Sequence, residues 1–197
     1  MKRGLARALV RVSEDLDRIG RPYALVGGLA VSARCEPRFT RDIDLAVAVD
    51  TDASAERFVA NLGYAIESTV EHSAVSRLAT VRLRGPGGRT APIVDLLFAS
   101  SGIEREICDH AEELEIVRGV RLRVACASDL IALKILSEAD RREQDRVDLV
   151  HLLRHASAED LARAESALEL IARRGFARGK DLTARLAHFR ARARADG

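Results

Sequence analysis

From about residue 127 onward the hydrophobic periodicity of the chain is that of helices alone, and this limits the folds open to it. Between residues 23 and 124, short apolar runs of strand length alternate with glycine and proline turn signals. Beyond Ser128 every segment has the period of a helix, with expected helices at 128–139, 143–155, 158–174 and 181–195. The sequence therefore predicts an α+β fold. A mixed β-sheet flanked by helices occupies residues 1–126, and a helical bundle at 127–197 closes a cleft against it.

Within the first part, turn signals divide the chain into short elements. We expect a helix over residues 2–19, a strand over 23–26, a turn at Gly27-Gly28 and a helix from 29 to about 35. A strand over 42–49 and a helix over 53–62 follow, the latter capped by Thr51 or Asp52 and stopped by Gly63. From Tyr64 onward the pattern predicts strands, a hairpin around residues 85–89, a helix over 103–114 and a second tight hairpin within 115–124.

Composition excludes few classes of protein. The 32 basic and 30 acidic residues leave a net charge of +2, which gives no overall argument for nucleic acid, although residues 173–197 hold eight basic and two acidic residues. That basic tail fits a phosphate backbone and a solvated helix face equally well. No run approaches the roughly 18 apolar residues of a membrane-spanning helix, so we expect a cytoplasmic protein with no membrane partner.

The three cysteines, Cys35, Cys108 and Cys126, are far apart and form no CxxC pair. They fit reduced thiols, argue against both a disulfide and a thiolate metal site, and have no evident histidine partner. His151 and His155 have the i,i+4 spacing of a zinc pair, but no third ligand is suggested nearby, so a helix surface is favoured.

Asp42 and Asp44 lie one residue apart in a run otherwise fit for a buried strand. Residues i and i+2 of a strand point to the same face roughly 7 Å apart, so both carboxylates can converge on one point. Two like charges so close repel unless a cation lies between them, and oxygen ligands suit Mg²⁺ or Mn²⁺. Upstream, the strand, the Gly27-Gly28 turn and the following helix form a place where backbone N–H groups can approach a phosphate.

Asp95 supplies a third carboxylate, inside the most apolar strand of the chain, residues 93–98. A charge there would cost several kcal/mol without a partner, so we interpret it as a member of the same metal site. The alternative is an edge strand on which Asp95 faces water.

Lys134 is one of only three lysines against 29 arginines, and it lies in an amphipathic helix. A compact ammonium on a flexible stem is a good partner for a triphosphate, whereas a surface lysine is the plainer interpretation. Asp145 and Asp148 follow three residues apart on one helix face. They fit either a solvated salt-bridge lattice or groups that orient Lys134 or a nucleotide ribose.

Taken together, the glycine pair, RFTRDIDL, the isolated strand aspartate, DLIALKI and RREQDRVDLVHLL resemble the DNA polymerase β-like nucleotidyltransferase superfamily, and within it the AbiEii and MenT toxins. The resemblance covers about residues 23–153. Gly28 takes a position that is usually serine in the superfamily.

The resemblance implies roles for particular residues. It makes Asp42, Asp44 and Asp95 ligands of two cations and places NTP phosphates against Gly27, Gly28 and Lys134. It sets Arg38 and Thr40 beside the active strand, and it makes Asp145 the acidic residue of a fourth motif, with Asp148 as the alternative. It also implies toxin activity on tRNA and a cognate antitoxin.

Our hypothesis from the sequence is thus Mg²⁺-dependent transfer of NMP from an NTP to an acceptor hydroxyl, with Asp95 as general base. One alternative changes the acceptor to a small molecule, as in aminoglycoside-modifying relatives. Another is a nucleotide-binding or partner-binding protein without turnover. The few aromatic residues, no Trp, five Phe and two Tyr, predict that RNA is held through its backbone or shape rather than by base stacking.

Overall fold

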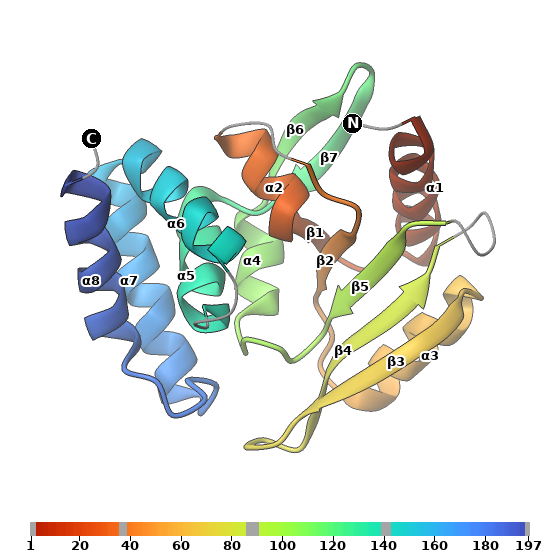
Figure 1. The fold of residues 1–197 in the computed structure, drawn as a ribbon. Helices are drawn as coiled ribbons and strands as arrows, with labels where there is room; N and C mark the ends of the chain where they lie inside the picture. The colour runs from red at the N-terminus through yellow and green to blue at the C-terminus, as the bar shows by residue number, and fades with distance from the viewer. Residues whose placement is uncertain (1–2, 36–38, 86–90, 139–142, 196–197) are drawn as a thin grey trace.

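A computed structural model describes residues 3–35, 39–85, 91–138 and 143–195. Within these ranges a seven-stranded mixed sheet and its helices lie beside a group of helices from the C-terminal part of the chain (Figure 1). The helices are α1 (Arg3–Ile19), α2 (Gly27–Arg34), α3 (Asp52–Leu62), α4 (Glu104–His110), α5 (Ala127–Ser137), α6 (Glu143–His155), α7 (Ala158–Arg173) and α8 (Leu182–Ala195). The strands are β1 (Tyr23–Val26), β2 (Ile43–Val47), β3 (Ala65–His72), β4 (Arg77–Arg84), β5 (Ile93–Leu97), β6 (Glu112–Val117) and β7 (Val120–Val124). The predicted α+β class is confirmed.

The strand order is β3-β4-β5-β2-β1-β7-β6, so β5 and β2 lie in the middle of the sheet. β2 pairs antiparallel with β1 and parallel with β5. The register sets Asp44 beside Val26 on one side and Asp95 on the other. The alternative that placed Asp95 on an edge strand is therefore wrong, because β5 has a partner on each side.

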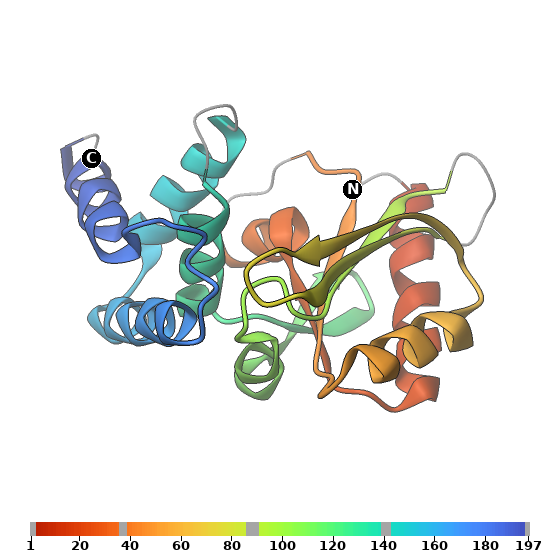
Figure 2. The ribbon, with the colours of Figure 1, turned by 90° about the horizontal axis from the view of Figure 1, so that it is seen from below.

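One face of the sheet is covered by helices of the N-terminal half. α1 packs on α3, α3 on β4, and α4 on β1 and β2, and Figure 2 shows them along one side of the sheet. α1 buries an apolar stripe of residues at helical spacing, with Leu9, Val12 and Leu16 among the most enclosed side chains. Burial of this face leaves the opposite face of β2 and β5 to carry polar groups.

Most predicted elements are found, and the differences lie at their ends. Thr51 caps α3 by accepting from the Ser54 N–H, and Gly63 ends it in the left-handed region, as expected. β2 is shorter than predicted, with Asp42 just before it, and α2 begins at Gly27 itself rather than after the glycine pair.

The helix predicted over residues 103–114 is partly wrong, because it ends at His110 and Glu112 begins β6. The strands on either side of the Arg118-Gly119 turn pair as far back as Glu112, because antiparallel pairing with β7 outweighs the local helix propensity of the glutamates in β6.

The helices α5 to α8 pack on one another, and α2 touches α5 and α6 at the boundary with the sheet. Several basic groups of the tail are engaged within the protein. Arg174 pairs with Glu106, Arg185 with Glu138 and Arg190 with Glu165, and Lys180 donates to the Leu136 and Glu138 carbonyls. These contacts indicate that several basic side chains of residues 173–197 stabilise the fold. In the described part of the chain, the helices are too short or too polar to span a lipid bilayer.

Candidate active site

A cavity of about 1120 Å³ lies between the sheet and the C-terminal helices. Its lining holds eight residues that the sequence singled out, Gly27, Gly28, Thr40, Asp42, Asp44, Asp95, Lys134 and Asp145. Arg38, which was predicted to flank the active strand, lies outside the described residues. The tertiary structure thus brings together candidates that are spread over more than a hundred positions of sequence.

The Asp44 carboxylate lies directly against Gly27. A Cβ added at Gly27 would come 2.1 Å from the Asp44 Oδ2 atom, and this glycine has a φ of +62°, in the left-handed region. Only glycine combines this backbone conformation with the space that the carboxylate fills. The Gly28 N–H also donates to the Asp44 carboxylate. The glycine pair therefore positions an aspartate, a role that the sequence analysis had not assigned to it.

The electrostatic surroundings of Asp44 are unfavourable to its negative charge. Burial, then the charge of Asp95, then that of Asp42 raise the pKa of Asp44 to about 6, although Lys134 and the Gly28 N–H act in the opposite direction. A divalent cation between these carboxylates would remove the repulsion, and an all-oxygen donor set suits Mg²⁺ or Mn²⁺. The residues present therefore fit such a cation.

Asp95 has a partner that the sequence analysis missed. Arg82 lies opposite Asp95 in the β4–β5 pairing. Its guanidinium donates Nε–H to Oδ1 at 2.8 Å and Nη2–H to Oδ2 at 2.6 Å. These hydrogen bonds raise the pKa of Arg82 above its ordinary value, so the group stays charged. The predicted hairpin around residues 85–89 indicated that the strands holding Arg82 and Asp95 pair, but the register that sets these two residues opposite each other comes from the structure.

Lys134 projects from α5 and is held by two carboxylates of α6. Its Nζ atom donates to Asp145 Oδ1 at 2.6 Å and to Asp148 Oδ2 at 2.7 Å. Asp148 is almost fully buried behind the lysine, whereas Asp145 lines the cavity. The proposal of a solvated lattice for these two aspartates is therefore wrong, and the interpretation that they orient Lys134 agrees with the geometry.

The cavity lining also contains groups that the sequence analysis did not single out. His72, at the end of β3, is 7% exposed and packs on Phe176 with the ring centroids 4.7 Å apart. Burial, then the charge of Arg178, lower the pKa of His72, which favours the neutral ring at pH 7. Arg178 itself donates to the carbonyl and hydroxyl oxygens of Ser100. No local motif marks these residues, since they meet only through the packing of the C-terminal part on the sheet.

Two solved structures share this architecture. An antigenic nucleotidyltransferase-like protein from Paracoccidioides brasiliensis aligns over 93% of this chain and 92% of its own, at 22% identity and a TM-score of 0.52. A putative nucleotidyltransferase from H. pylori aligns over 99% of this chain and 95% of its own, at 12% identity and a TM-score of 0.51. At these identities the likeness concerns the fold.

No curated protein sequence matches the chain. Residues 7–196 match the family described as "Nucleotidyl transferase AbiEii toxin, Type IV TA system". This span is nearly the whole chain, and it agrees with the nucleotidyltransferase class that the sequence predicted. The chain therefore belongs to the AbiEii nucleotidyl transferase toxin family.

Proposed function

We propose that this protein transfers a nucleoside monophosphate from an NTP to a hydroxyl group of an RNA acceptor, with tRNA as the expected substrate, and that the reaction needs Mg²⁺ or Mn²⁺. One observation carries the proposal. Asp42, Asp44 and Asp95 line the same cavity as Lys134, which reaches it from the C-terminal helices. Carboxylates on one wall and an ammonium on another are the groups that a metal-bound triphosphate requires.

Asp42, Asp44 and Asp95 are the residues that would hold the metal. A bound divalent cation would offset charge on the α-phosphate and the departing pyrophosphate and would lower the pKa of the acceptor hydroxyl. The raised pKa of Asp44 supports this assignment, because burial and the neighbouring charges of Asp95 and Asp42 make its negative charge unfavourable and a bound cation would relieve this.

In the proposed reaction the acceptor oxygen forms a bond to the α-phosphorus while the bond to the bridging oxygen breaks and pyrophosphate departs. The proton of the acceptor hydroxyl needs a base, and we assign that role to Asp95. Arg82 supports the assignment because its two hydrogen bonds fix the orientation of the carboxylate. Each carboxylate oxygen has a second lone pair, so the arginine does not exhaust its accepting capacity.

Lys134 is placed to contact the triphosphate. Its ammonium has three N–H donors, and its contacts with Asp145 and Asp148 use two of them. The two aspartates would thus hold the lysine in position while the third N–H meets a phosphate oxygen. α2 begins at Gly27 in the wall of the same cavity, so the positive end of its dipole also favours phosphate there.

The choice of an RNA acceptor rests on the family and not on the charge of the cavity. Arg82 and Arg178 line the cavity together with Glu71 and the site aspartates, and Arg82 is paired with Asp95. The matched family is described as a toxin, and together with the resemblance to toxins that act on tRNA this supports RNA over a small-molecule acceptor.

The test supplies each α-labelled NTP with Mg²⁺ and either total tRNA or a panel of aminoglycosides. Wild-type protein should label tRNA and release pyrophosphate, whereas Asp44→Ala should not. Asp50→Ala is a matched control because this exposed aspartate pairs with Arg105 and does not line the cavity. Equal labelling of tRNA by wild type and Asp44→Ala would end the proposal. Label that appears only on a drug would select the small-molecule acceptor, and NTP binding without pyrophosphate release would select a non-catalytic protein.

The family description also supports a cognate antitoxin. Expression of the wild-type chain should then inhibit growth, and co-expression of an adjacent antitoxin reading frame should relieve the inhibition. Asp44→Ala should not inhibit growth on its own. Inhibition that persists in that variant would separate toxicity from nucleotidyl transfer.

A further inference from the structure

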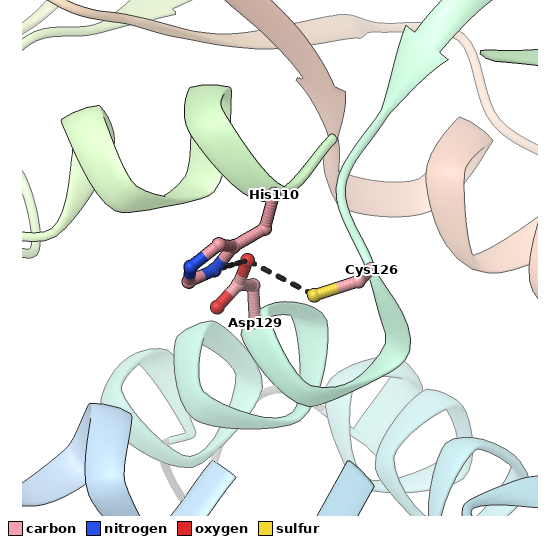
Figure 3. A group of neighbouring side chains, drawn as sticks. All are labelled: His110, Cys126 and Asp129. Carbon is pink, nitrogen blue, oxygen red and sulfur yellow. Dashed lines mark hydrogen bonds and ion pairs between the residues drawn. The ribbon is translucent and has the colours of Figure 1, made fainter. Parts of the chain in front are cut away.

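A second cluster of metal-ligating side chains lies outside the cavity, where α4 meets the start of α5. His110 is the last residue of α4, Cys126 immediately precedes α5, and Asp129 lies in the first turn of α5. Figure 3 shows the three side chains pointing toward one another. The sequence spacing had argued against a thiolate metal site because these cysteines have no close partner in the chain. The fold instead brings a histidine and an aspartate to Cys126.

The donor atoms are close enough to share one ion. The Cys126 Sγ and Asp129 Oδ2 atoms are 3.1 Å apart, the His110 Nδ1 and Asp129 Oδ2 atoms are 3.3 Å apart, and all three lie within 4.8 Å of one another. Zinc bonds of about 2.0–2.3 Å in a tetrahedron separate the ligand atoms by about 3.3–3.8 Å. The Cys126–Asp129 and His110–Asp129 separations lie within a few tenths of an ångström of this range, and the His110–Cys126 separation is no more than 4.8 Å.

The chemistry of the donors selects the metal. One sulfur, one imidazole nitrogen and one carboxylate oxygen suit Zn²⁺, whereas Mg²⁺ prefers oxygen ligands alone. The burial also differs between the ligands. Cys126 and Asp129 are 7% and 3% exposed, but the His110 side chain is 53% exposed, which gives an ion a route from solvent. Three protein ligands leave the fourth position to water.

Hydrogen bonding alone is the competing explanation. A thiol and an imidazole can both donate to the Asp129 carboxylate, the Ser128 hydroxyl lies 3.0 Å from the Cys126 sulfur, and a carboxylate is favourable in the first turn of a helix. The two explanations differ in a measurable way. Hydrogen bonds keep the thiol proton, whereas Zn²⁺ replaces it with a metal–sulfur bond.

We propose that His110, Cys126 and Asp129 bind Zn²⁺ at the junction of α4 and α5, at a site separate from the catalytic cavity. α4 packs on β1 and β2, and α5 carries Lys134 five residues beyond Asp129. A bound Zn²⁺ would therefore cross-link α5, which bears Lys134, to α4, which packs on the sheet. Its role is structural and does not depend on the proposed reaction.

Cobalt provides a test that needs no nucleotide. The full chain is stripped with a chelator, dialysed, and titrated with Co²⁺ in excess Mg²⁺, which occupies oxygen-only sites. Wild type should develop a near-ultraviolet thiolate-to-cobalt band that saturates at one Co²⁺ per chain and disappears when Zn²⁺ is added. Cys126→Ser should lack the band. Cys35→Ser, which removes a partly buried thiol at the end of α2, should keep it.

Zinc affinity supplies a second readout. His110→Ala should bind Zn²⁺ at least tenfold more weakly than wild type, and Zn²⁺ should raise the thermal midpoint of wild type but not that of either site variant. The histidine is largely exposed, so this variant decides the question even if Cys126→Ser fails to fold. A wild type without the band, or an unchanged zinc affinity in His110→Ala, would overturn the proposal and leave the hydrogen-bonded explanation.

Discussion

The Asp44→Asn substitution tests whether the clustered carboxylates of the cavity lower the stability of the metal-free protein. Burial and the charges of Asp95 and Asp42 raise the pKa of Asp44 from 3.8 to about 6. A shift of about two units corresponds to about 3 kcal/mol, and partial solvent access from the cavity reduces this to about 1–3 kcal/mol. Asparagine keeps the shape of the side chain and an oxygen for the Gly28 N–H, but it carries no charge. The variant should therefore be more stable than wild type at pH 7 in chelator, although it should be inactive.

The sign of the pH dependence follows from proton binding. Below pH 3.8 the carboxyl is protonated in both the folded and the unfolded chain, so it makes no difference to stability. Between about pH 4 and pH 6 the folded protein retains a proton that the unfolded chain has lost, so this group's contribution to the free energy of unfolding falls as pH rises. Above about pH 6 the penalty is complete and constant. The stability difference between Asp44→Asn and wild type should thus grow from pH 4.5 to pH 6.5 and then level off.

Urea unfolding in chelator at a series of pH values measures this difference. Asp52→Asn is a control of opposite sign. Burial of Asp52 is outweighed by hydrogen bonds from Arg77 and the Leu78 N–H, which lower its pKa, so that variant should lose stability at neutral pH and recover relative to wild type on acidification. Addition of Mg²⁺ should stabilise wild type more than Asp44→Asn. A difference between Asp44→Asn and wild type that does not change between pH 4.5 and 7.5 would refute the reasoning.

Three further substitutions probe the same site. Gly27→Ala should abolish transfer because its Cβ would occupy the place of the Asp44 carboxylate. Gly63→Ala is the control: Gly63 has a similar φ of +66° with nothing within 4 Å of an added Cβ, so this variant should lose stability but keep activity. Transfer assays and thermal unfolding of both variants separate the two effects. Lys134→Met should lose about 3–5 kcal/mol of stability in urea unfolding because it removes the ammonium that compensates the charges of Asp145 and the buried Asp148. Changing both partner carboxylates to amides should restore the fold but not the activity, and restored activity would contradict the phosphate role. Arg82→Gln should lower the Mg²⁺ concentration at half-maximal binding in calorimetric titrations because it removes a positive charge that repels a cation beside Asp95. Weaker Mg²⁺ binding would contradict that repulsion.

The sequence predicted the fold class and the positions of most elements because their signals are local. Turn glycines, the Thr51 cap and the apolar period of α1 act within a few residues of one another, and the structure has the elements that they predict. The error at residues 103–114 arose where pairing with β7 outweighed local helix propensity. Strand pairing depends on a partner elsewhere in the chain, so a single segment cannot reveal it.

For the candidate site, the sequence determined which chemistry-bearing residues exist, since a carboxylate in an apolar strand or a rare lysine in an apolar helix stands out against its neighbours. Only the tertiary structure decided what each of them touches. It placed Arg82 on Asp95, Asp145 and Asp148 on Lys134, the Asp44 carboxylate in the space left by Gly27, and His110 beside Cys126. Partners of this kind are fixed by sheet register and by the packing of helices on the sheet, which join distant segments and leave no periodic trace in any one of them.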